Sequence, residues 1–306
     1  MSPLGIFFRI IEGEKVKIID SIKDNKKRLS FEVFPPKTDA SFDSVEEAAF
    51  KIAELKPSFM SVTYGAGGGT SKYTLDIARD IKNEHNIETL AHLTCVSSSK
   101  ETVLERIKDL KEAGIENIMA LRGDLTPEMS LEDSKSWDYK HASELVYDIK
   151  KAGDFCIGGA CYPEVHPESK NHEEDILHLK EKVEAGCEFL TTQMFFENNL
   201  LYNFIDKLEK HGIYVPVVAG IMPITNINQV ERALNLSGSY MPPKFLNLVE
   251  KYGSDKLSMK QAGISYATEQ IIDLYANGIT NVHVYTMNSP EVARTIMGNV
   301  SNIINK

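Results

Sequence analysis

Short apolar runs recur along the chain, and a stretch with helical periodicity follows most of them. Eight runs have the length of strands, at residues 29–35, 59–65, 89–95, 117–124, 155–163, 189–196, 215–223 and 282–288. Amphipathic patterns lie between them, for example at 44–55, 102–114 and 173–186. Several of these patterns end in glycine, as helix C-termini often do. The alternation predicts a parallel sheet with helices outside it.

Eight strand–helix units in 306 residues predict a closed (β/α)8 TIM barrel. A doubly wound open sheet is the alternative, and it is disfavoured because no GxGxxG motif follows the first strand. No linker or shift in composition divides the chain, so we expect a single domain over residues 1–306. The longest connection, 226–281, contains a second helical pattern and predicts extra helices between the last two strands.

Charge and composition limit the partners of the protein. The formal net charge of -10 argues against nucleic acid, because phosphate binding needs a basic surface. No apolar run reaches the ~20 residues that span a bilayer, and the first ten residues lack the features of a signal peptide. The four cysteines form no CxxC pair and fall in or beside apolar runs, which predicts buried free thiols. We therefore expect a cytoplasmic protein with no nucleic-acid or membrane partner.

Polar residues stand where the predicted strands end. In a barrel of this kind the C-terminal ends of the strands meet on one rim, which carries the active site. The polar residues at these ends are Glu32, Thr63, His92, Thr94, Arg122, Gly123, Asp124, Tyr162, Glu164, His166, Gln193, Tyr285, Thr286 and Asn288. A purely structural barrel would be apolar almost to the strand ends, so this convergence predicts an enzyme.

Several of these residues have a structural interpretation as well. Glu32 stands near Phe31 and Phe34 in an apolar strand, so either it is paired with an arginine or its proton is used. His92 could be a hydrogen-bonded core histidine, and Asp124 could cap the next helix. The glycine run at 65–69 indicates a loop that needs positive φ or close backbone approach, and it also resembles a phosphate cradle.

The motifs of several common site types are missing from the sequence. The histidines are not spaced as metal ligands, and neither a GxSxG elbow nor a P-loop is present. We therefore predict no metal. The histidines to which we assign no role, because they fall on expected helix surfaces, are His85, His172, His178 and His211.

Eight segments in this order and spacing resemble the methylenetetrahydrofolate reductases. The segments are SFEVFPPK, SVTYGAGG, AHLTC, ALRGD, YPEVHPE, TTQMFF, GIMPI and VYTMN. The resemblance covers about residues 25 to 303. The length is similar to that of the bacterial members, which have only the catalytic domain.

The resemblance implies a flavoprotein oxidoreductase that reduces 5,10-methylenetetrahydrofolate to 5-methyltetrahydrofolate with electrons from NADH or NADPH. It implies FAD rather than FMN as the cofactor, and a homo-oligomer, since relatives are commonly oligomers. The residues that would contact FAD by resemblance are Thr63, His92, Leu121, Arg122, Gly123, Asp124, Ala160, Tyr162, His166, Asp175 and Lys182.

The resemblance also implies catalytic and substrate-binding roles. Glu32 matches the general acid, and its apolar neighbours should raise its pKa so that it can protonate N10 of the folate. Asp124 would stabilise the cationic iminium that forms when the ring opens. Gln193 would bind the pterin, and Tyr285 and Met287 would complete the substrate site.

Two positions depart from some bacterial relatives. Ala233 and Leu234 stand near the place of a phenylalanine that packs on bound ligand, and Ser289 stands where arginine occurs. These departures keep open a second hypothesis, in which a partner protein supplies the electrons. A third hypothesis is a barrel lyase without flavin.

Overall fold

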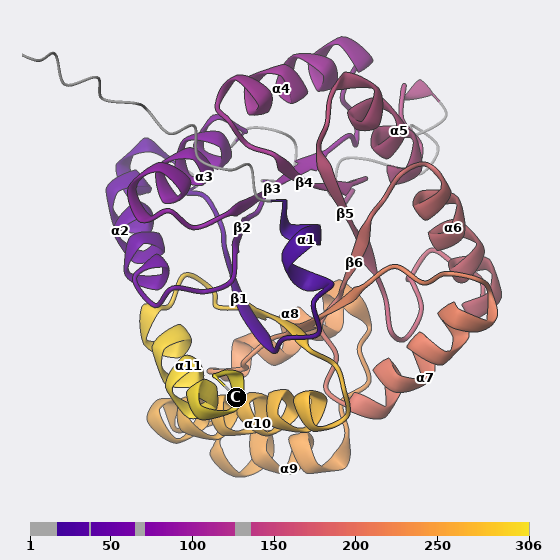
Figure 1. Cartoon of the computed structure of the whole chain (residues 1–306). Coiled ribbons are helices and arrows are strands. Elements are labelled where there is room, and N and C mark those ends of the chain that lie inside the picture. Colours follow the sequence, from indigo (N-terminus) through magenta and orange to yellow (C-terminus); the bar gives the residue numbers. More distant parts are fainter. Residues whose placement is uncertain (1–16, 37, 65–70, 126–135, 306) are drawn as a thin grey trace, which may run out of the picture.

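The computed structural model describes residues 17–36, 38–64, 71–125 and 136–305. Eight parallel strands form a closed barrel in chain order, and the labelled strands β1 to β6 can be followed around it in Figure 1. They are β1 (Arg28–Val33), β2 (Met60–Val62), β3 (Thr89–Thr94), β4 (Asn117–Leu121), β5 (Cys156–Cys161), β6 (Phe189–Thr192), β7 (Val217–Ile221) and β8 (Asn281–Tyr285). The predicted (β/α)8 barrel is confirmed, and the open sheet is wrong because β1 pairs with β8, from Arg28 opposite Asn281 to Glu32 opposite Tyr285.

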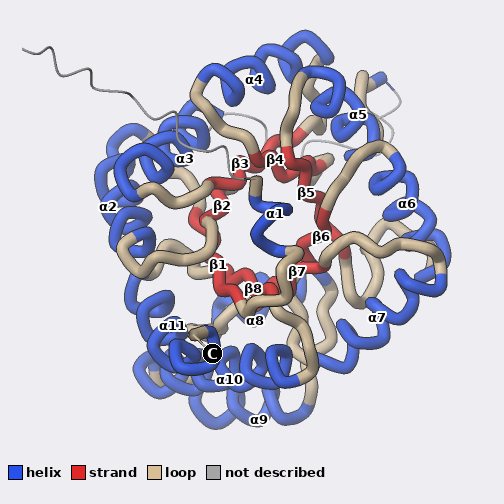
Figure 2. Tube along the Cα trace, in the orientation of Figure 1, coloured by secondary structure: helices blue, strands red, loops and turns tan. Residues whose placement is uncertain are grey.

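Helices surround the ring of strands (Figure 2). Those that alternate with the strands are α2 (Phe42–Ala53), α3 (Ser71–His85), α4 (Lys100–Glu112), α5 (Ala142–Ala152), α6 (His172–Glu184), α7 (Asn198–Lys210) and α11 (Pro290–Ile304), and a 3₁₀ turn, η1 (Asp39–Ser41), precedes α2. The extra helices predicted before the last strand are α8 (Ile227–Ser237), α9 (Pro243–Tyr252) and α10 (Lys256–Ala276). No helix in the described ranges is both long and apolar enough to cross a membrane.

Several strands end earlier than their apolar runs predict. The run at 189–196 continues past the end of β6 at Thr192, because Met194 and Phe196 are buried in a second cluster with Met222 and Phe245. This cluster packs the loop after β6 against the added helices. Burial of a loop thus lengthens the apolar run without lengthening the strand.

A short helix, α1 (Ile18–Ile22), lies across the mouth formed by the N-terminal ends of the strands (Figure 2). Ile18, Ile19 and Ile22 are buried and pack in one cluster with residues such as Phe59 and Phe189. The side chains of two asparagines at strand starts hold its ends: Asn117 Oδ1 accepts from Ile18 N at 2.8 Å, and Asn281 Nδ2 donates to Ile22 O at 3.0 Å. This helix was not predicted, since five residues are too few to show helical periodicity.

The four cysteines are free and buried, as predicted. Burial raises the pKa of Cys95, Cys156 and Cys187 to about 12. The thiolate is the reactive form, so these thiols act as small apolar groups at neutral pH.

Candidate active site

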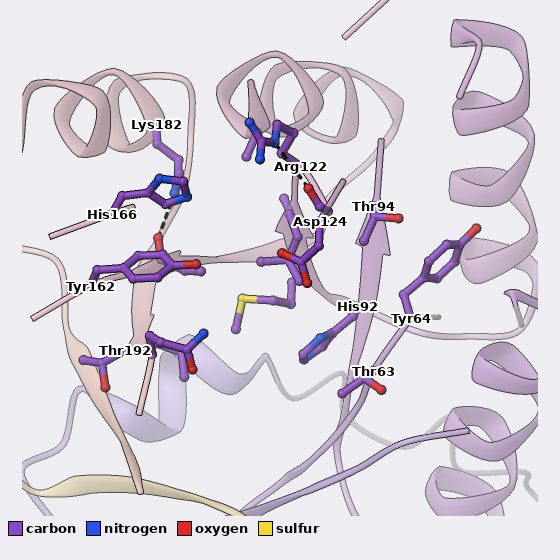
Figure 3. Close-up of a pocket in the computed structure, with 18 of the residues that line it drawn as sticks. Thr63, Tyr64, His92, Thr94, Arg122, Asp124, Tyr162, His166, Lys182 and Thr192 are labelled. Carbon is purple, nitrogen blue, oxygen red and sulfur yellow. Dashed lines mark hydrogen bonds between the residues drawn. The ribbon is translucent and has the colours of Figure 1, made fainter. Parts of the chain in front are cut away.

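A cavity of about 540 Å³ lies at the C-terminal ends of the strands (Figure 3). Every residue that the sequence assigned to catalysis, cofactor or substrate lines it. These residues are Glu32, Thr63, His92, Leu121, Arg122, Gly123, Asp124, Ala160, Tyr162, His166, Asp175, Lys182, Gln193, Tyr285 and Met287. The fold therefore brings together residues spread over more than 250 positions of the chain. The glycine run at 65–69 lies outside the described residues.

Glu32 has no cationic partner among the described residues. Its Oε2 lies 3.5 Å from Ser61 Oγ and 3.8 Å from His92 Nε2. Burial raises the pKa of Glu32 to about 8, while burial lowers the pKa of His92 to about 4. At neutral pH the pair is therefore an uncharged carboxylic acid beside a neutral imidazole. The interpretation of Glu32 as the partner of a core arginine is wrong.

The segment after β4 is shaped by Arg122 and Gly123. The Arg122 guanidinium donates two hydrogen bonds to the Glu168 carboxylate, at 2.6 and 2.5 Å. Gly123 has φ of +95°, and a Cβ there would lie 2.7 Å from Val96 Cγ1, so glycine is required. Asp124 follows and lines the cavity (Figure 3). The N-cap residue of α5 is His141. Whether Asp124 caps the segment that follows it remains a prediction, because residues 126–135 lie outside the described ranges.

The connection from β5 to α6 forms another wall. The rings of Tyr162 and His166 meet edge to face with centroids 4.6 Å apart. Asp175, in the first turn of α6, accepts a hydrogen bond from His166 N at 3.1 Å. Burial lowers the pKa of His166, and its Nδ1 accepts from Glu168 N at 3.1 Å, so the neutral ring carries its proton on Nε2. Asp175 therefore holds the backbone of this wall at His166. The sequence around Asp175 is typical of a solvent-exposed helix and does not by itself indicate this contact.

Lys182 reaches the cavity from α6. Its Nζ donates to Ala160 O at 2.7 Å (Figure 3), and burial lowers the pKa of the ammonium group. A lysine ammonium has three protons to donate. The position thus offers positive charge and donors beside the end of β5.

Three buried polar atoms on the cavity wall have no hydrogen-bond partner within the described ranges. They are His92 Nε2, Tyr64 Oη and Thr191 Oγ1. Buried polar atoms are nearly always paired in folded proteins, and unpaired ones mark places where a ligand or water belongs. The residues present therefore fit a large ligand with polar groups along its length.

Some lining residues were missed by sequence reasoning. His178 was placed on a helix surface without a role, but it lines the cavity and its ring stacks on His141 with centroids 5.8 Å apart. The signal was its spacing, because positions 175, 178 and 182 share one face of a helix. His283 was also missed, although it stands two residues before Tyr285 and therefore points to the same side of β8.

The two departures from bacterial relatives lie away from the cavity wall. Ala233 is buried and Leu234 exposed on α8, while the neighbouring Arg232 lines the cavity. Ser289 is the N-cap of α11 and its Oγ accepts from Val292 N at 3.4 Å.

Known proteins resemble the chain over most of its length. The sequence profile of a family described as methylenetetrahydrofolate reductase matches residues 17–301. The 5,10-methylenetetrahydrofolate reductases of Pectobacterium carotovorum and Escherichia coli are 35% and 34% identical over 268 residues, with 88% of this chain and 88% of each relative covered. An Arabidopsis thaliana protein, methylenetetrahydrofolate reductase (NADH) 1, is 32% identical, and the match covers 93% of this chain but 51% of the plant protein.

A solved structure supports the fold independently. An uncharacterized protein from Clostridium thermocellum, described as binding two copies of 5-methyl-5,6,7,8-tetrahydrofolic acid, superimposes with a TM-score of 0.66 at 13% identity. The match covers 93% of this chain and 99% of that protein. At this identity the similarity shows the shared fold alone.

Proposed function

The chain belongs to the methylenetetrahydrofolate reductase family, whose reaction is the reduction of 5,10-methylenetetrahydrofolate, and we propose that it performs this reaction with bound FAD and with electrons from NADH or NADPH. The observation that carries the proposal is the cavity itself, which gathers every residue assigned by resemblance on one rim of the barrel. The Clostridium thermocellum barrel, which shares this fold, is described as binding 5-methyl-5,6,7,8-tetrahydrofolic acid, so the fold is compatible with a folate ligand.

The cavity residues suit a flavin. Thr63, His92, Ala160 and Lys182 would hold it, and the buried unpaired Nε2 of His92 is one atom that a ligand would satisfy. When bound, the flavin supplies a hydride to the methylene carbon of the folate. The choice of FAD over FMN follows from the family resemblance, as does our proposal that the protein is a homo-oligomer.

Glu32 is the proposed general acid. The folate accepts a hydride only after its five-membered ring opens, which requires a proton on the departing nitrogen, N10. A carboxyl group with a pKa of about 8 is protonated at neutral pH and can donate that proton. Gln193, whose Oε1 accepts from Met194 N at 2.9 Å, lines the cavity and would bind the pterin, and Tyr285 and Met287 line the same cavity.

The rate of folate reduction should depend on pH through Glu32. Because its pKa is raised to about 8, the acid form is fully populated below that pH and is lost as the pH rises through it. We expect the single-turnover rate of folate reduction to be flat between pH 6 and 7 and to fall about tenfold per pH unit above about pH 8. Stopped-flow mixing of reduced protein with folate measures this. A rate that rises with pH over this range would contradict the assignment.

Asp124→Asn should raise the reduction potential of the flavin. A carboxylate beside the flavin opposes the negative charge that accumulates on reduction. A nearby charge is worth about 1 to 3 kcal/mol at the rim of a site, or roughly 20 to 60 mV for a two-electron couple. A dye-coupled redox titration measures the shift, and an unchanged potential would place Asp124 away from the flavin.

One anaerobic experiment tests the function. NADH or NADPH, added to the purified protein, should bleach the visible flavin absorbance, and the folate should then restore it. If the flavin bleaches only with a chemical reductant, and folate then restores it, the folate chemistry stands and the electrons come from a partner protein. Protein without flavin after purification and reconstitution with FAD would contradict the whole proposal.

The partner-protein hypothesis rests on the departures from bacterial relatives. Neither Ala233 nor Ser289 lines the cavity, and the residue of this part of α8 that does is Arg232. A nicotinamide donor would therefore find no aromatic side chain to pack on at this place. Co-purification of a second polypeptide that restores bleaching would decide for this hypothesis.

A further inference from the structure

A chain of buried hydrogen bonds runs beneath Glu32 across three adjacent strands. Ser30 Oγ on β1 lies 2.7 Å from His283 Nδ1 on β8. His283 Nε2 lies 2.9 Å from Ser61 Oγ on β2, and Ser61 Oγ lies 3.5 Å from Glu32 Oε2. Ser30 Oγ also lies 3.0 Å from the backbone oxygen of Val282. Ser30, Ser61 and His283 are each at most 1% exposed, so water does not compete for these bonds.

The direction of each bond follows from counting protons. A carbonyl oxygen can only accept and a hydroxyl has one proton, so Ser30 donates to Val282 O. Ser30 must then accept from His283 Nδ1–H. A neutral imidazole carries one N–H, so His283 Nε2 accepts, and its donor is Ser61.

Ser61 has therefore used its only proton on His283. With that proton on His283, Ser61 accepts from Glu32, and a carboxyl group that donates is a protonated one. A Ser61 hydroxyl turned towards Glu32 would instead donate to the carboxylate and lower its pKa. Burial lowers the pKa of His283 to about 3, so the ring stays neutral at physiological pH and carries a single N–H, as the assignment of donors and acceptors requires. The other titratable groups around Glu32 are His92 on β3, which is also neutral, and Tyr285 on β8, whose pKa burial raises.

We propose that His283, with its tautomer fixed by Ser30, is a positioning residue that makes Ser61 a hydrogen-bond acceptor for the protonated carboxyl group of Glu32. The tautomer of His283 and the protonation of Glu32 do not depend on the proposed function. Only the step in which Glu32 gives its proton to the folate rests on it. With the opposite tautomer of His283, each hydrogen bond in the series would run in the other direction, and Ser61 would donate to the carboxylate of Glu32. That arrangement stabilises the anion, which is the form that cannot serve as an acid.

The tautomer can be measured without flavin or substrate. Protein labelled with ¹⁵N-histidine gives long-range ¹H–¹⁵N correlations that distinguish protonated from bare ring nitrogens. His283→Phe identifies the His283 signals by their loss. At pH 6.5 we expect a protonated Nδ1 and a bare Nε2. A protonated Nε2 in the unchanged protein would overturn the proposal, whatever the protein proves to catalyse.

The pH profile of the folate step tests the effect on Glu32. His283→Phe frees the Ser61 proton for the carboxylate, so the fall in rate should begin at least one pH unit lower than in the unchanged protein. Ser30→Ala is a smaller change that keeps the imidazole but removes the acceptor that holds the proton on His283 Nδ1. It should shift the pH profile in the same direction. Should His283→Phe fail to fold, Ser30→Ala decides alone. A shift to higher pH, or none, would overturn the proposal.

A matched control is available just before β2, at Ser58. Ser58 Oγ donates to Leu29 O at 3.1 Å, outside the chain of bonds and away from the cavity. Ser58→Ala should leave the pH profile unchanged, and a shift equal to that of Ser30→Ala would show that any lost serine moves it. Absence of folate reduction in the unchanged protein would contradict the proposed function but leave the tautomer result standing.

Discussion

Replacing Glu32 with glutamine is expected to slow folate reduction about 10³-fold while flavin reduction by the electron donor stays within about twofold. Glutamine keeps the size and hydrogen-bonding capacity of the side chain but has no proton to give to N10. The other residues proposed to hold the flavin are untouched. Single-turnover measurement of the two half-reactions separates the effects.

Stability provides an internal control for this variant. The pKa of Glu32 in the folded protein is raised to about 8 from its ordinary value near 4.5, so at pH 7 the folded state keeps a proton that the unfolded state releases. This difference favours unfolding increasingly as the pH rises from about 4.5 to 8. Glutamine removes it, so the free energy of unfolding of Glu32→Gln at pH 7 should be no lower than that of the unchanged protein.

Glu46→Gln is a suitable companion. Glu46 lies on α2 away from the cavity, and burial raises its pKa as well. This variant should retain both half-reactions. If Glu32→Gln lost both half-reactions equally, the residue would serve cofactor binding or folding, and the general-acid assignment would be wrong.

The barrel and its rim were predictable because each strand is a short apolar run that ends in a polar residue. Each strand is buried on both faces, so each appears as an apolar run, and the polar residue that ends the run falls on the rim. Glu32, His92 and Gln193 were found in this way, and the cavity brings them together. The pairing that closes the ring, between β1 and β8, needed only the count of eight units.

The parts that were missed have physical reasons. A five-residue helix such as α1 has no period to detect. His283 stands in the middle of an apolar strand, where a hydrogen-bonded core histidine and a residue acting on the site have the same sequence signature. Only the distances to Ser30 and Ser61 separate the two, and those distances depend on the register of three strands.

Gly220→Ala is expected to lower the free energy of unfolding by about 3 kcal/mol and to weaken folate binding. Gly220 lies on β7, where a Cβ would come within 2.3 Å of Thr192 O and 2.4 Å of Tyr285 Oη. Tyr285 Oη donates to Thr192 O at 2.5 Å, which fixes the tyrosine at the cavity wall. An added methyl group cannot share this space, and the contact on the Thr192 side is backbone, which yields little. Urea unfolding and titration with the folate measure the two effects.

Gly298→Ala on α11 is the matched control, because a Cβ there meets no atom within 4 Å. In the interior of a helix this change should stabilise the protein by up to about 1 kcal/mol. Tyr285→Phe, which removes only the hydroxyl, should relieve part of the clash, so the double variant should be more stable than the sum of the single changes predicts. If Gly220→Ala unfolds at the same urea concentration as the unchanged protein and binds folate equally well, the bare backbone of β7 does not set the position of Tyr285. A loss of stability without a loss of folate affinity would instead assign Gly220 to packing and remove Tyr285 from the substrate site.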